Sequence, residues 1–267
     1  DRRRNVEWEV EPRIRYNDAG VRLPAAVAVR RGAALRAGGY QESKLTWTSS
    51  GYDDLSSRGH GLVWQEPRLQ TLSHGYFSPR IGHWTWQLQA ALLQEGNEDL
   101  AAQLTGELRY YPRDDLDIGL TFMPRWSRDW LLWREDNLFA SYHSQRREAS
   151  MNVNWFPGRR HELRLKLQWL GLKAEDPVAY RIGTDGLLVE SSDSVDAFTV
   201  NNFGMQLRYR YELGQRRELY VVYARGGDET LARAGDLHSS QGLGDLLGGA
   251  SDLRDADQLL VKLRWEL

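Results

Sequence analysis

Apolar and polar residues alternate with a period of two along most of the chain. Near its end, Leu259, Val261 and Leu263 fall on one face of an extended segment, whereas Lys262 and Arg264 fall on the other. Successive side chains of a β-strand point to opposite faces, so this alternation predicts a two-faced strand. The same pattern recurs over residues 6–16, 84–92, 102–110, 116–122, 163–169 and 199–213.

No segment shows a convincing helical period. The best candidate runs over Leu237–Leu253, but it contains Gly242, Gly244, Gly248 and Gly249. Each glycine in a helix interior costs roughly 1 kcal/mol relative to alanine, so we expect a loop there. The fold is therefore predicted to be all-β.

Alternation by itself does not separate a membrane barrel from a soluble two-sheet sandwich, because both place apolar residues on one face of each strand. Three features favour the barrel. The predicted strands are long, about ten to sixteen residues against a usual five or six. Aromatic residues gather at the ends of the apolar rows, as interfacial girdles do. The connections also sort by length, and a soluble β-rich binding protein stays as the alternative.

The pattern predicts about twelve antiparallel strands in up-and-down order, an even number typical of bacterial outer-membrane barrels. We place them at 3–16, 21–30, 34–48, 63–77, 82–94, 98–111, 115–125, 137–156, 160–174, 198–213, 217–227 and 256–267. Tight links at 31–33, 78–81, 112–114, 157–159 and 214–216 alternate with longer ones at 49–62, 126–136, 175–197 and 228–255, while 17–20 and 95–97 are short. We expect the tight turns and both termini to face the periplasm.

Composition excludes several functional classes. A formal net charge of −2 gives no electrostatic case for binding nucleic acid. No run approaches 18 apolar residues, which excludes a helical membrane span, and the absence of cysteine excludes disulfide and thiolate–zinc staples. No metal-binding or nucleotide-binding motif occurs, so we expect no metal, no cofactor and no enzymatic activity. His143 beside Ser141 and Ser144 is the one local hint of a hydrolase.

Several stretches resemble the carboxy-terminal barrel of bacterial outer-membrane proteins of unknown function that carry a carbohydrate-binding, family-nine-like domain before the barrel. The stretches are Asp129–Leu138, His161–Trp169, Phe198–Phe203, Gln206–Leu213, Leu219–Gly227 and Asp257–Leu263. The resemblance implies a single barrel domain over 1–267, part of a larger barrel or lacking an amino-terminal domain. It also implies an outer-membrane location and a link to carbohydrate. The family usually ends in Phe, whereas this chain ends Trp265-Glu266-Leu267.

The strand faces predicted to line the lumen carry charges of both signs. The candidate solute-contacting residues are Glu107, Arg109, Arg164, Lys166, Arg208, Arg210, Glu212, Lys262 and Arg264. Buried charges must be paired or hydrated, so these rows form either a polar route for a hydrophilic solute or an ion-pair network that plugs the lumen. Arg164, Lys166, Arg208 and Arg210 on neighbouring strands would favour anionic solutes, provided that no carboxylates neutralise them.

A second set of residues is predicted to meet the membrane interface: Trp126, Trp130, Trp133, Trp169, Tyr209 and Trp265. The first three fall in a predicted loop, 125–136, where they form either a girdle or a contact with lipopolysaccharide. The expected partners are outer-membrane lipid and lipopolysaccharide, and a protein partner or a missing amino-terminal half. The function predicted is passage or binding of a hydrophilic, carbohydrate-related or anionic solute. The alternatives are a structural or anchoring barrel with a plugged lumen, and a barrel hydrolase.

Overall fold

The computed structural model describes residues 3–96, 99–233 and 242–265. This part of the chain forms fifteen strands and one short helix. Their bounds are β1 Arg3–Arg13, β2 Ala26–Leu35, β3 Tyr40–Thr48, β4 Gly51–Asp53, β5 Val63–Gln65, β6 Arg68–Phe77, β7 Trp84–Gln94, β8 Leu100–Arg113, β9 Leu116–Glu135, β10 Leu138–Trp155, β11 His161–Ile182, β12 Leu188–Glu190, β13 Ala197–Gly214, β14 Arg217–Arg233, α1 Leu243–Ala250 and β15 Ala256–Trp265.

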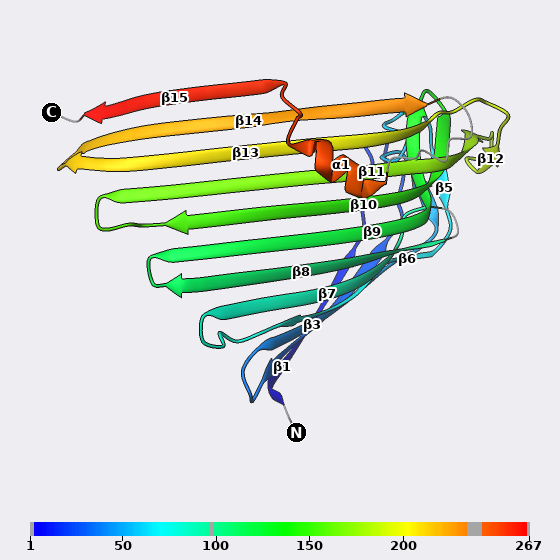
Figure 1. The fold of residues 1–267 in the computed structure, drawn as a ribbon. Helices are drawn as coiled ribbons and strands as arrows, with labels where there is room; N and C mark the ends of the chain where they lie inside the picture. Colours follow the sequence, from blue (N-terminus) through cyan, green and yellow to red (C-terminus); the bar gives the residue numbers. More distant parts are fainter. Residues whose placement is uncertain (1–2, 97–98, 234–241, 266–267) are drawn as a thin grey trace.

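A single thirteen-stranded sheet dominates the fold (Figure 1). Twelve of its strands follow one path, β1-β2-β3-β6-β7-β8-β9-β10-β11-β13-β14-β15, and every neighbouring pair is antiparallel. Strand β12 pairs with β11, and β4 and β5 form a separate hairpin. The prediction of an all-β, antiparallel, up-and-down barrel of about twelve strands is confirmed.

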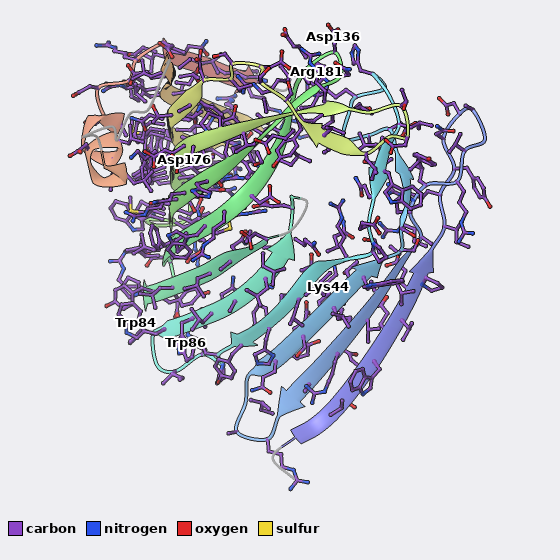
Figure 2. All side chains as sticks on the ribbon, turned by 90° about the vertical axis from the view of Figure 1, so that its right-hand side faces the viewer. Lys44, Trp84, Trp86, Asp136, Asp176 and Arg181 are labelled. Atoms are coloured by element: carbon purple, nitrogen blue, oxygen red, sulfur yellow. The ribbon has the colours of Figure 1, made fainter. Side chains whose placement is uncertain are left out.

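The sheet curves into an arc with an apolar convex face and a polar concave face. Figure 2 shows Trp84 and Trp86 on the convex side and Lys44 on the concave side. The period-two alternation produces this division, because residues paired across strands share a face. One convex row runs through Leu88, Gly106, Phe122, Ala149, Trp169 and Phe203.

The arc does not close on itself within the described residues. Strand β1 pairs only with β2, and β15 pairs only with β14. The side chains of β15 are exposed along its length. Each end of the arc therefore presents a strand edge whose backbone groups lack a sheet partner on one side.

Short links gather at one end of the sheet, which we call the short-turn end. They span 36–39, 78–83, 114–115, 156–160 and 215–216. The predicted tight turn at 31–33 is wrong, because Gly32 lies inside β2 and the turn follows at Gly38 and Gly39, both with positive φ. Glycine is required at position 32 because the Tyr40 hydroxyl occupies the space that a side chain there would fill.

At the opposite end, the loop end, several predicted loops are partly strand. Strand β9 continues to Glu135, β11 to Ile182 and β14 to Arg233, so the loops predicted at 126–136, 175–197 and 228–255 are shorter than expected. The ends of β9, β10 and β11 pair with one another and form a tongue beyond their neighbours, with register shifts on both sides of β10. Cross-strand pairing of these tips overrides the loop-like composition.

The prediction of a loop over Leu237–Leu253 is corrected in part. Residues 242–253 are described, and α1 occupies Leu243–Ala250, while 237–241 lie outside the described residues, as do Glu266 and Leu267. Leu243, Leu246 and Ala250 pack on Trp169 and Phe203, and this burial offsets the helix cost of glycine. None of the described helices is long and apolar enough to span a membrane.

Candidate functional site

The concave face carries a chain of ion pairs across β11, β13, β14 and β15, which we call the polar wall. Glu162 accepts from both Arg164 and Arg210, with a distance of 3.2 Å to Arg210 Nη1. Glu218 lies 2.5 Å from Arg210 Nη2 and 3.8 Å from Arg264 Nη1. Charges of opposite sign therefore alternate over four neighbouring strands.

These carboxylates change the expected electrostatics of the wall. The predicted preference for anionic solutes required that no carboxylate neutralise Arg164 or Arg210. That condition is not met, because Glu162 and Glu218 pair with these two arginines. Arg208 instead lies over the Tyr220 ring, at 5.6 Å from its centroid. Among the described residues, Lys166, Lys262 and Glu212 make no ion pair. The wall thus combines a neutralised network with a few free charges.

A second polar cluster joins β7, β8 and β9 on the same face. Arg109 Nε donates to Glu107 at 2.6 Å and approaches Asp117 at 3.9 Å, while Gln87 donates to the other oxygen of Glu107 at 2.9 Å. Glu107 and Arg109 are among the residues predicted to contact solute, whereas Gln87 and Asp117 are not. Their positions follow from the strand register, which sequence alternation does not fix.

At the loop end, the segment between β3 and β6 reaches across the arc and contacts the link between β11 and β12. Trp64 N donates to Gly186 O at 2.8 Å, and the Tyr52 hydroxyl donates to Asp185 O at 3.3 Å. A pocket of about 510 Å³, the loop-end pocket, lies between this segment and the tongue. Its lining includes Trp64, Glu66, Arg68, Gln94, Asp99, Arg128, Asp129, Ser141, His143, Asp176 and Tyr180.

The loop-end pocket is polar and partly aromatic. His143 Nδ1 and Asp176 Oδ2 are 3.0 Å apart, and both side chains are more than half exposed. Trp64 Nε1 donates to Glu66 Oε1 at 2.9 Å. Among the described residues, no cluster of three or more His, Asp or Glu is arranged to hold a metal ion. Apart from His143, no local pattern in the sequence points to this pocket, because its lining residues come from segments spread between residues 56 and 188.

The link after β12 is anchored beside the tongue by an arginine clamp. Arg181 at the end of β11 donates to both oxygens of Asp193, at 2.6 and 2.8 Å, and its remaining terminal nitrogen donates to Asn137 at 2.6 Å. These hydrogen bonds, with a further one from Ser191, lower the pKa of Asp193 to about 2. Figure 2 places Arg181 next to Asp136 at the loop end.

The three tryptophans expected in one loop lie instead on β9 and separate into three environments. Trp126 is exposed on the convex face, in register with Ala102 and Gln145. Trp130 packs near Tyr142 and Phe198, inside a small core. Trp133 stacks on His60 at 5.2 Å. The three residues therefore do not form one continuous girdle. The register of β9 shifts between Ser127 and Trp130, and Trp130 and Trp133 are an odd number of residues apart, so they point to opposite faces.

The other predicted interface aromatics lie on the convex face. The Tyr209 hydroxyl is hydrogen-bonded to His161 Nδ1 at 2.8 Å. The Arg217 guanidinium lies 3.9 Å from the centroid of the Trp265 ring, and both contacts are close to the short-turn end. Trp84 stacks on Tyr110 at the same end, at 4.1 Å. Trp169 is buried beneath α1. Aromatics with a polar contact at one level are typical of a membrane interface.

Comparison with known proteins finds a solved structure of similar fold. No family model matches the chain, and no curated protein matches it. A solved structure, the copper transporter OprC, is similar with a TM-score of 0.55 and 10% sequence identity over 98% of this chain. The chain spans only 42% of the length of that structure. At this identity the likeness shows the fold alone, and it agrees with the transmembrane β-barrel architecture expected from the alternation.

Proposed function

We propose that this chain forms part of the wall of an outer-membrane β-barrel that binds and passes a hydrophilic solute. The observation that carries the proposal is the division of the sheet into an apolar convex face and a charged concave face (Figure 2). Such a wall separates a hydrated route from hydrocarbon, because the convex side chains suit lipid and the concave ones suit water. In this arrangement the short turns face the periplasm.

For the solute we favour a neutral, carbohydrate-like molecule over an anion. Glu162 and Glu218 neutralise Arg164 and Arg210, two of the four cations that would have attracted an anion. The loop-end pocket offers Trp64 and Tyr180 beside several carboxylates, and aromatic rings with polar neighbours suit sugar rings. Its volume of about 510 Å³ lies within the usual range for small-molecule sites.

Swelling of liposomes that contain the folded protein tests this proposal. Arabinose is the neutral probe and gluconate the anionic one, and we expect arabinose to enter faster. Trp64→Ala should slow arabinose entry, whereas Trp84→Ala, on the convex face, should not. Faster entry of gluconate would contradict the neutral-solute proposal.

A structural barrel with a plugged lumen is the runner-up. The fixed ion pairs of Arg109, Arg210 and Glu218 favour it, since paired side chains hold one another across the concave face. Correctly folded protein that lets neither arabinose nor gluconate enter would support this alternative and exclude the open route.

A hydrolase is the third candidate, and one arrangement favours it. Ser141 and His143 are two residues apart on β10 and both line the loop-end pocket, where His143 is bonded to Asp176. Ser144, the other serine noted in the sequence, is buried and does not line the pocket. The solute-passage proposal predicts no cleavage of p-nitrophenyl esters. Cleavage that His143→Ala abolishes would favour the hydrolase.

The free edges of the arc bear on the protein's partners. Backbone groups in hydrocarbon must be hydrogen-bonded, so β1 and β15 need neighbouring strands inside a membrane. The chain spans less than half of the solved structure that it resembles. We infer that further strands, from an amino-terminal half or a protein partner, complete the barrel. Crosslinking between cysteines placed on β1 or β15 and that partner would test this.

A further inference from the structure

A cleft of about 610 Å³ lies on the convex face beside α1, and we call it the apolar cleft. Its walls are apolar side chains from the neighbouring strands β7, β8, β9, β10, β11 and β13 and from α1. They include Trp86, Leu108, Phe122, Met151, Phe203 and Leu247. The cleft is separate from the polar wall and from the loop-end pocket, because convex and concave residues alternate along each strand.

The floor of the cleft is a gap in the apolar row. Gly106 lies between Leu88 and Phe122 in that row, and a Cβ added at Gly106 would meet no atom within 4 Å. Its neighbours are large apolar residues, so the missing side chain leaves a depression where lipid would otherwise meet a smooth surface. A groove of this size in a lipid-facing wall takes up an acyl chain more favourably than water.

Helix α1 forms one side of the cleft and is held there by directional contacts. Trp169 Nε1 donates to Asn201 Oδ1 at 2.9 Å, and Asn201 Nδ2 donates to Leu246 O at 2.9 Å. Arg225 donates to Ser251 O at 2.5 Å just after the helix. Leu247, on the free side of the helix, stays about half exposed and borders the cleft. The helix is therefore a fixed wall.

The cleft crosses the apolar face obliquely. On β7 it includes Trp86, close to the short-turn end of that strand, whereas on β13 it includes Phe203, in the middle of the strand. A chain lying in the cleft would begin near α1 and run towards the short turns. This direction matches an acyl chain that descends from a headgroup on the loop-end side.

A cation lies at the loop-end side of the cleft. Arg147 lies two residues before Ala149 on the same face of β10, in register with Pro124 and Gly171. Within the described residues it makes no ion pair, whereas Lys173 on the same face is paired with Glu175 at 2.8 Å. A guanidinium at this position is complementary to a phosphate, which it binds through two parallel hydrogen bonds.

We propose that the apolar cleft and Arg147 form a binding site for a phosphorylated, acylated lipid of the lipid A type. The acyl chain lies between α1 and Gly106, and Arg147 contacts the phosphate. The proposal rests on the membrane placement given under the proposed function, and it adds a specific lipid site that solute passage does not require.

Native mass spectrometry of the detergent-solubilised protein tests the site, with purified lipid A as the probe and dimyristoylphosphatidylcholine as the comparison lipid. Wild-type protein should retain lipid A in preference to the phosphatidylcholine. Gly106→Leu fills the cleft and should lower lipid A retention roughly tenfold, as expected when about two methylenes lose their buried place. Arg147→Gln should lower lipid A retention about threefold and phosphatidylcholine retention less, because the choline cation already balances the phosphate of phosphatidylcholine.

Gly204→Leu is the matched control, since Gly204 is in register with Gln168 on the concave face and is equally free of neighbours. It should retain lipid A as wild type does. Leu247→Ala, which removes the exposed border of the cleft, serves as a second variant if Gly106→Leu does not fold. Equal lipid A retention by wild type and by the folded cleft variants, or equal retention of both lipids by wild type, would overturn the proposal. Arabinose entry through Gly106→Leu should match wild type, which separates failure of this site from failure of solute passage.

Discussion

The two faces of the arc are built from the same strands but are held by different forces. On β11, Leu163, Leu165 and Leu167 face outward and need only an apolar surrounding. Glu162 and Arg164, interleaved with them, need particular partners on particular strands. Burial of apolar surface is non-directional, whereas a charge-assisted hydrogen bond requires a fixed distance and angle. The convex face should therefore tolerate apolar exchanges that the concave face would not tolerate among its charges.

The largest expected effect comes from placing a charge on the convex face. Leu165→Arg, in the middle of an apolar row, should lower the free energy of unfolding by about 2–4 kcal/mol if that face meets hydrocarbon. Denaturant unfolding in lipid vesicles, followed by tryptophan fluorescence, measures this. Gln168→Arg, on the exposed concave face of the same strand, is the matched control and should change the stability little. Equal losses for the two variants would remove the distinction between the faces.

The contact between Asn201 and α1 is an exception on the convex face, because it consists of directional hydrogen bonds beneath the helix and not of apolar burial alone. Asn201→Ala leaves Trp169 Nε1 and Leu246 O unpaired in a buried place, at a cost of about 1–3 kcal/mol. We expect faster hydrogen exchange of the amides of Leu243–Ala250, with exchange of β7 unchanged. Unchanged exchange in the helix would mean that apolar packing alone holds it.

Removing one carboxylate from the polar wall should alter ion selectivity. Glu218→Gln removes one negative charge from the polar wall while Glu162 still pairs with Arg210, so anions should gain permeability relative to cations by roughly twofold. Reversal potentials in planar bilayers measure this ratio. Glu190→Gln, on β12 and away from the wall, is the control and should leave the ratio unchanged. The same selectivity in both variants would show that the wall does not face the ions.

The smallest effect concerns the arginine clamp at the loop end. The pKa of Asp193 is lowered from 3.8 to about 2, so its stabilising contribution is present above pH 3.8 and is lost as the pH falls through about 2. Protease cleavage within residues 183–196 should therefore be constant between pH 7 and pH 4, when measured with acid-stable and neutral proteases. Exchange of the same amides should rise below about pH 3. Arg181→Gln should remove this acid transition, and a transition centred near pH 4 in wild type would contradict the lowered pKa.

The site residues show how far sequence reasoning extends. Alternation placed Arg109, Arg164 and Arg210 on one face, and the structure puts all three there. It did not identify Glu162 as the carboxylate that joins Arg164 to Arg210, because Glu162 and Arg210 are 48 residues apart in sequence. The loop-end pocket could not be predicted from local patterns either, because the segments around it meet through contacts such as that between Tyr52 and Asp185, which are 133 residues apart.

Two segments show where local rules are overridden by tertiary contacts. The glycine content of residues 242–249 argues against a helix, and yet Leu243, Leu246 and Ala250 find a buried place on Trp169. The aromatic and arginine residues of 126–134 suggest a loop, and yet β9 and β10 pair along them. In both cases, contacts with distant strands supply stabilisation that exceeds a propensity of about 1 kcal/mol.

By itself, the sequence determined that the protein is all-β, that its strands have two unlike faces and that short turns gather at one end. These features follow from a period of two and from turn-forming residues, which act over a few neighbouring positions. Only the tertiary structure decided which charges pair, how far the tongue extends, where α1 rests and that the described arc stays open. Those outcomes depend on strand register and curvature, which are set by contacts between residues far apart in the chain.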